Sequence, residues 1–268
     1  MIRRPAVAGM FYPSDPRELN RVLDEMWPAG GLPPGNALGL VCPHAGYVYS
    51  GRVAAKTVAR AATPGSVIVL GPNHRGLGAA AAVMTQGAWL MPWGKVELDQ
   101  QLGQALLNHS SILEEDHLAH SQEHSIEIQA PLLWKNNPDF KLTPICLARS
   151  DLKACRDIGA AMARAIEESD HPVLMVASTD MTHYEPQEMA RLKDRQAIDR
   201  ILELDPEGLY DTVSSQNITM CGVIPTVCVL YAALELGARQ AELIQYTTSG
   251  EINEDYSQVV GYAGLMIV

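Results

Sequence analysis

The sequence is poor in the features that mark several common protein classes. Its five cysteines are odd in number, scattered and without a CxxC pair, so the sequence indicates neither a disulfide framework nor a structural zinc knuckle. Lys and Arg number 20 against 31 Asp and Glu, and no run of basic residues forms a patch. A net charge of −11 would repel a phosphate backbone, and nucleic acid is therefore not an expected partner.

Long apolar runs are also missing. The most apolar window, residues 218–234, is interrupted by Thr219, Pro225 and Thr226 and falls short of a comfortable membrane span. The first residues are basic, but prolines and a glycine break up the apolar stretch that follows, unlike the core of a signal peptide. We expect a cytoplasmic protein that has no membrane partner.

The composition that remains is typical of a globular chain. With 268 residues, of which 47% are hydrophobic, the chain can bury a sizeable core, and its length does not require a second domain. The 17 prolines and 21 glycines are spread along the sequence instead of being concentrated in a linker. We expect one domain over residues 1–268.

Short apolar runs alternate with helical patterns along the chain. Runs without clean alternation indicate strands buried on both faces, and they occupy residues 38–41, 67–70, 142–147, 173–177, 243–247 and 259–268. Helical spacing of apolar residues follows Asp15 and Pro16, which resemble an N-cap and a first helical residue, and recurs over 53–61, 152–166 and 192–202. This order predicts an α/β fold with a central, mainly parallel or mixed sheet flanked by helices on both faces.

Three histidines follow three of these strands at similar distances. They are His44, His74 and His183. Ligands of such sheets bind beyond the carboxyl ends of the strands, so we expect these side chains to converge on one crevice. Each alone is explained as a loop or capping histidine, but three equivalent positions favour a shared purpose. Neutral imidazole is the commonest protein metal ligand, and the pattern therefore predicts a metal site.

Cys221 stands just before an apolar helical run that reaches Gly237. The positive end of a helix lowers the pKa of a nearby thiol and favours the thiolate needed for ligation or nucleophilic attack. A buried small apolar residue is an equally good interpretation of Cys221. A metal-free cysteine nucleophile assisted by His183 is a further alternative. Asp180 precedes His183 by three residues and is interpreted either as a group that orients an imidazole or as a turn residue.

A competing motif lies at His120, Glu123 and His124, which read H-x-x-E-H. On a helix this pattern places two imidazoles on one face beside a glutamate and is typical of inverted zincins. Short motifs occur by chance, and no later helix offers an obvious third ligand. A zinc peptidase is therefore the weaker alternative, while Glu123 and His124 are also candidates for lining the crevice.

Six blocks of the sequence, in order and across nearly the whole chain, resemble the Memo family. Its bacterial and archaeal members are called AmmeMemoRadiSam system protein B. The blocks are AVAGMFY at 6–12, PHAGYVYSG at 43–51, LGPNH at 70–74, EHSIE at 123–127, STDMTH at 178–183 and MCG at 220–222.

The resemblance implies a fold similar to the LigB-type class III extradiol dioxygenases, which hold non-haem Fe(II) with two histidines and a carboxylate. On that resemblance His44 and His74 match the histidine ligands, and Cys221 stands where the dioxygenases have their acidic ligand. His183 matches their acid/base histidine, for which Asp180 would set the tautomer. A thiolate is softer than a carboxylate and admits copper(I) or zinc. The resemblance therefore implies one transition-metal ion, Fe(II) or copper first and zinc as an alternative.

The family match also bears on activity and partners. It implies a metal-dependent redox protein or oxygenase-like enzyme, in which Phe11 and Tyr49 line the crevice, and a functional link to AMMECR-type and radical SAM proteins. The alternative is a non-catalytic module that binds a peptide or small molecule in the same crevice. Arg75, beside His74, is the residue that favours an anionic ligand for such a module.

Overall fold

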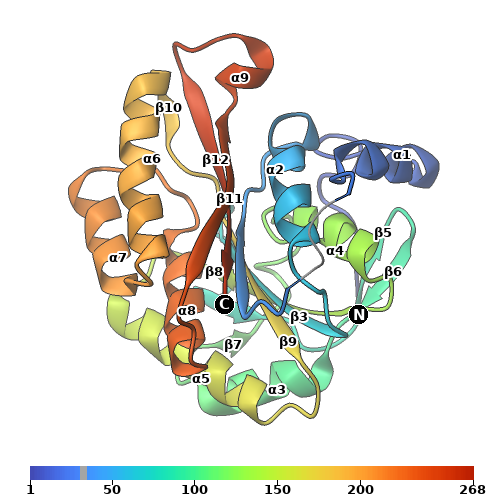
Figure 1. The fold of residues 1–268 in the computed structure, drawn as a ribbon. Coiled ribbons are helices and arrows are strands. Elements are labelled where there is room, and N and C mark those ends of the chain that lie inside the picture. Colours follow the sequence, from blue (N-terminus) through green and yellow to red (C-terminus); the bar gives the residue numbers. More distant parts are fainter. Residues whose placement is uncertain (31–34) are drawn as a thin grey trace.

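Four buried parallel strands form the middle of the computed structural model, which describes residues 1–30 and 35–268 (Figure 1). They lie side by side in the order β2 (Gly39–Cys42), β9 (Val173–Ser178), β3 (Ser66–Pro72) and β8 (Lys141–Leu147). Almost every residue in them is buried, as expected of strands covered on both faces. All four strands were predicted from their apolar runs.

Antiparallel strands extend this sheet at both edges. On one side β12 (Val259–Ile267) pairs with β2, and β11 (Ala241–Thr248) and β10 (His183–Glu185) pair with β12. On the other side β4 (Ala81–Val83) pairs with β8, and β7 (Glu114–Glu115) pairs with β4. The sheet is mixed, as predicted. A separate small sheet holds β1 (Ile2–Arg3), β5 (Ala88–Met91) and β6 (Gly94–Glu97).

Helices cover both faces of the main sheet, which confirms the predicted fold class (Figure 1). One face packs against α1 (Pro16–Met26), α2 (Tyr47–Ala59) and α4 (Ala130–Asn136). The other packs against α3 (Gln100–His109), α5 (Leu152–Glu167), α6 (Gln187–Leu202), α7 (Pro206–Ser215) and α8 (Val223–Glu235). Two short helices, η1 (Glu127–Gln129) and α9 (Gly250–Asn253), complete the described part.

Successive side chains of a strand point to opposite faces of the sheet. Each central strand therefore contributes apolar residues to the hydrophobic cores on both faces. In β3, Ile68 and Leu70 enter the core beneath α5 and α8, whereas Val67 and Val69 enter the core beneath α1 and α2. The strand ends are thereby fixed between two packed layers. The loops that leave these ends carry the candidate site residues.

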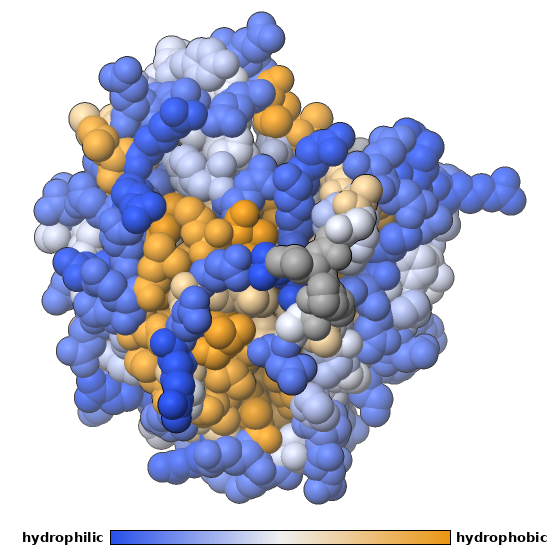
Figure 2. Space-filling model, viewed as in Figure 1, coloured by the Kyte–Doolittle hydropathy of each residue, from blue (hydrophilic) through white to orange (hydrophobic). Residues whose placement is uncertain are grey.

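One face of the molecule has a broad apolar area over α8 and β11 (Figure 2). Leu234 at the end of α8 is 40% exposed, and Leu236, Leu243 and Ile244 nearby are partly buried. Within the residues that the structure describes, no helix is long and apolar enough to cross a membrane.

Candidate metal centre

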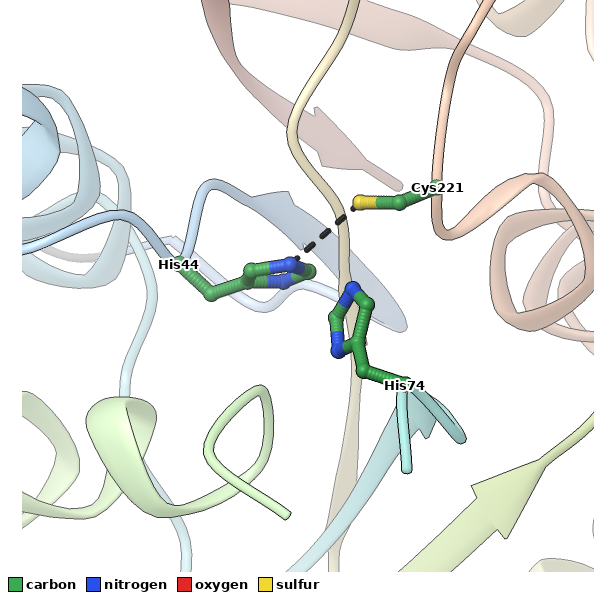
Figure 3. A group of neighbouring side chains, drawn as sticks. All are labelled: His44, His74 and Cys221. Atoms are coloured by element: carbon green, nitrogen blue, oxygen red, sulfur yellow. Dashed lines mark hydrogen bonds between the residues drawn. The ribbon is translucent and has the colours of Figure 1, made fainter. Parts of the chain in front are cut away.

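Three side chains from distant parts of the chain meet at the carboxyl edge of the parallel strands. His44 follows β2, His74 follows β3 and Cys221 directly precedes the N-cap of α8. The three side chains point toward one another (Figure 3). His44 Nε2 lies 3.3 Å from Cys221 Sγ, and the ring centroids of His44 and His74 are 5.2 Å apart. One ligand atom from each lies within 4.8 Å of the others. The structure thus brings together the three residues that the family resemblance implies as ligands, and His183, the third strand-end histidine, is not in this group.

Hydrogen bonding fixes which nitrogen of His44 carries a proton. Its Nδ1 lies 3.0 Å from the Ser178 hydroxyl oxygen, and that hydroxyl donates its only proton to the Ser125 carbonyl at 2.6 Å. The same oxygen accepts from the Gln129 amide at 2.8 Å. With its proton committed, Ser178 accepts from His44 as well, so Nδ1 is the protonated nitrogen. The Nε2 lone pair of His44 therefore faces Cys221.

His74 reaches the same tautomer through a carboxylate. Its Nδ1 lies 2.9 Å from Oε1 of the fully buried Glu123, which also accepts from the backbone amides of His74, His124 and Ser125. Burial acts to raise the pKa of Glu123, but the hydrogen bonds from His74 and the amides outweigh it and lower the pKa to about 2. An ionised acceptor requires a donor at Nδ1, and Nε2 of His74 is left free.

A second group of metal-capable residues, His74, Glu123 and His124, overlaps the first. The His124 ring stacks on His74 with centroids 4.6 Å apart. The Glu123 carboxylate, however, is already occupied by ring and backbone donors. We therefore interpret Glu123 as the residue that orients His74, and the first group as the better ligand set.

The thiol of Cys221 differs from the sequence-based expectation. Burial and the nearby charge of Asp180 raise the pKa of Cys221 to about 12, whereas the end of the following helix was expected to lower it. The backbone amide of Asp180 donates to Sγ at 3.2 Å, but this contact does not compensate for the lost solvation. The prediction of a lowered pKa was wrong.

Asp180 also has a different role from the one predicted. Its Oδ1 accepts the backbone amides of His44 at 2.8 Å and of Ala45 at 3.3 Å. The His183 ring instead lies with Nδ1 3.0 Å from the Thr219 carbonyl, so this carbonyl, and not Asp180, sets the His183 tautomer. Burial raises the pKa of Asp180 to about 6. The residue fixes the loop that carries His44.

The H-x-x-E-H stretch is not helical, so the weaker alternative of a zinc peptidase lacks the helix that it requires. Residues 117–126 form turns, and His120 is completely buried with neither ring nitrogen hydrogen-bonded. Within residues 1–30 and 35–268, no metal-capable group includes His120. His124 turns the other way, its ring centroid 5.4 Å from that of His44.

The two aromatic residues expected in the crevice lie in different settings. The Phe11 ring packs edge-on against His124 with centroids 5.0 Å apart and so belongs to the centre's surroundings. Tyr49, in the first turn of α2, is 38% exposed and shares a surface hollow with Phe11 that does not include Cys221. Arg75 donates to the Gln122 carbonyl at 3.4 Å and lines another hollow.

Sequence reasoning missed the residues that hold the ligands in place. Ser178, Gln129 and Thr219 are ordinary polar residues whose partners lie 36 to 134 positions away, so no local pattern encodes these contacts. Ser178 offered one signal, because it directly follows the predicted strand 173–177 and stands two residues before Asp180.

Fold and site together define an α/β protein with a candidate metal-binding group at the carboxyl ends of its parallel strands. The chain matches the family model described as Memo-like protein over residues 3–266 and belongs to the Memo family. A MEMO1 family protein of Methanopyrus kandleri is 45% identical, with 99% of each chain covered. Another, from Methanothermobacter thermautotrophicus, is 41% identical over 99% of this chain and 100% of the relative.

A solved structure of an uncharacterized protein from Escherichia coli K12 is similar at a TM-score of 0.49. It is 12% identical and covers 85% of this chain and 98% of its own. This likeness is too distant to support an argument about the site.

Proposed function

We propose that this chain is a metal-dependent redox protein in which His44, His74 and Cys221 bind one transition-metal ion. The observation that carries the proposal is the pair of fixed tautomers. Both imidazoles donate from Nδ1, which leaves Nε2 unprotonated, and a ligand atom of each lies within 4.8 Å of the thiol sulfur. Partners that fix a ring in this way are typical of metal-ligating histidines.

The donor set fits an ion of intermediate or soft character. Two imidazoles and a thiolate suit Fe(II), copper and zinc, and we place Fe(II) or copper first. When bound, a redox-active ion would supply electron transfer to a substrate or to O₂. Burial is the main reason that the pKa of His44 lies well below its usual value, and the neighbouring imidazoles of His124 and His74 lower it further. The ring is therefore neutral and able to donate its lone pair.

The remaining residues of the centre hold groups in place or move protons. Thr219 fixes His183 by contacts to both its backbone amide and its ring, at 2.7 and 3.0 Å, so that Nε2 of His183 is free. We assign this half-buried imidazole as the proton carrier. A Phe11 and His124 wall shields one side of the centre.

The test is a metal count after anaerobic incubation with Fe(II), Cu(I) or Zn(II) and removal of unbound ion. We expect about one ion per wild-type chain and none in the His44→Ala/His74→Ala variant. His109→Ala, on the surface of α3, is the matched control and should bind like wild type. Equal metal in the double variant would overturn the ligand assignment.

Redox function is tested separately from binding. Oxygen uptake by the Fe(II)- or Cu(I)-loaded protein with a catechol-like reductant should fall strongly in the His183→Gln variant while its metal content stays constant. A protein that loads with metal but consumes no oxygen and shows no reversible redox couple is a binding module, and the redox proposal is then wrong.

A further inference from the structure

A cavity of about 500 Å³ adjoins the candidate centre. Two of the proposed ligands, His74 and Cys221, form part of its wall, and the rest comes from the loop after β8, from α7 and from the start of α8. Its volume lies within the range of sites that enclose small molecules. Any molecule in this cavity would contact the proposed metal ligands directly.

The charges around this cavity are unlike those of the chain as a whole. Acidic residues outnumber basic ones by 31 to 20, yet no Asp or Glu lines the cavity. Arg149, an exposed residue in the loop that follows β8, is the single Lys or Arg in the lining. Within the part of the chain that the structure describes, no ion pair or side-chain hydrogen bond involves Arg149. Its guanidinium is available to a ligand.

The rest of the lining combines apolar and neutral polar residues. The apolar residues include Leu147, Val213, Ile218, Met220, Val223 and Ile224. Most of these apolar side chains are buried, so they form a preformed wall. Tyr210, one of the polar residues, already donates its hydroxyl to the Ser150 carbonyl at 3.3 Å. The cavity thus presents an apolar wall, neutral polar groups and one cation at its rim.

We propose that this cavity binds a small, largely apolar molecule bearing a carboxylate, with the carboxylate on Arg149 and the apolar body beside His74 and Cys221. The inference rests on the proposed function, because it makes the cavity the substrate site of the metal centre. An arginine guanidinium pairs with a carboxylate through two parallel hydrogen bonds. One guanidinium matches one carboxylate in charge, whereas a phosphate dianion would retain negative charge.

The test compares 4-phenylbutyrate with its neutral amide, 4-phenylbutyramide, by calorimetric titration of the full chain with and without bound metal. We expect the carboxylate to bind about ten-fold or more tightly than the amide, since charge-assisted hydrogen bonds exceed neutral ones by that amount. Arg149→Met should remove this preference. Arg75→Met, in the neighbouring hollow, is the control and should retain it.

Two further measurements separate the outcomes. Ser214→Trp, an exposed position of α7 in the cavity wall, should weaken both probes by steric exclusion. Equal binding of the two probes, or a preference unchanged in Arg149→Met, would overturn the inference while leaving a metal count of one per chain intact. If wild-type protein binds no metal but prefers the carboxylate probe, and Arg149→Met loses that preference, the carboxylate site is supported and the metal centre is refuted. Inorganic phosphate competing more strongly than 4-phenylbutyrate would also contradict the carboxylate assignment.

Discussion

The two candidate histidine ligands are oriented by partners of different charge. His44 donates to the neutral hydroxyl of Ser178, whereas His74 donates to the ionised carboxylate of Glu123. A carboxylate partner makes the imidazole a stronger donor to a metal, and removing such a partner typically weakens metal affinity by about 10- to 100-fold. At this scale the centre is defined by its supporting residues as much as by its ligands.

Replacing Glu123 tests that support. Glu123→Gln removes the charge and places an amide among backbone N–H donors, so we expect metal affinity to fall by about 10- to 100-fold. Competition against a chelator of known affinity measures the change. Glu115→Gln, a partly exposed neighbour on β7, should have no effect. If Glu123→Gln folds like wild type and keeps wild-type affinity, the orienting role is refuted.

His120 makes a separate prediction about acid stability. Burial is the main reason that the pKa of His120 falls from 6.5 to about 3. Below pH 6.5 the unfolded chain binds a proton that the folded chain does not, so stability falls as pH decreases toward 3. At pH 5 this amounts to about 2 kcal/mol. Urea unfolding at pH 7 and pH 5 measures how much the free energy of unfolding falls over this range. The fall should be about 2 kcal/mol smaller in His120→Leu than in wild type. Equal falls in the two proteins would exclude the effect.

At the scale of elements, the buried carboxylate of Asp194 in α6 contacts β11, β12 and the segment before β10. Asp194 of α6 accepts the Thr182 amide at 2.8 Å and the Tyr246 hydroxyl of β11 at 2.7 Å. A Cβ on Gly261 of β12 would lie 1.9 Å from Asp194 Oδ2, so only glycine fits there. This network fixes the segment between β9 and β10 that leads to His183.

The network predicts unequal costs for two substitutions. Asp194→Ala leaves a buried amide and a hydroxyl without partners and should lower the free energy of unfolding by about 1–3 kcal/mol for each. Tyr246→Phe removes one hydrogen bond and should cost about 1 kcal/mol. Urea unfolding monitored by circular dichroism measures both. A cost for Asp194→Ala no larger than that for Tyr246→Phe would contradict the account.

The main strands and helices could be predicted from sequence because burial on both faces or on one face leaves a simple apolar pattern. The shorter strands could not, since β7 has two exposed residues and no pattern to detect. The helix that the H-x-x-E-H motif would need around His120 does not form, and the reason is local. Asp116 accepts the Ala119 amide at 2.8 Å and the Ala79 amide at 3.1 Å, which stabilises a turn in place of a helix.

At the scale of the whole molecule, a buried ion pair joins the N-terminal strand β1 to η1. Arg3 of β1 lies 2.6 Å from Glu127, and both side chains are almost completely buried. Glu127 also accepts from the amides of Ala6 and Val7 and from the Tyr12 hydroxyl. These contacts hold the segment that places Phe11 beside the centre. The partners in these contacts are more than 100 positions apart, so no local sequence pattern could indicate them.

Breaking this pair should be costly. Arg3→Met leaves the Glu127 carboxylate buried without its cation, and we expect a loss of about 3–5 kcal/mol in the free energy of unfolding. The Arg3→Met/Glu127→Gln double variant should recover part of that loss, because it leaves no buried charge. Guanidinium unfolding of the three proteins provides the comparison. A double variant less stable than Arg3→Met would count against this explanation.

The central claim is that His44, His74 and Cys221 bind one metal ion through two nitrogens and one sulfur. X-ray absorption spectroscopy of the zinc-loaded protein tests it most directly, because a thiolate sulfur at about 2.3 Å is resolved from nitrogen at about 2.0 Å. We predict one sulfur neighbour in wild type and none in Cys221→Ser. A wild-type spectrum without sulfur, or one that is unchanged in Cys221→Ser, would contradict the claim.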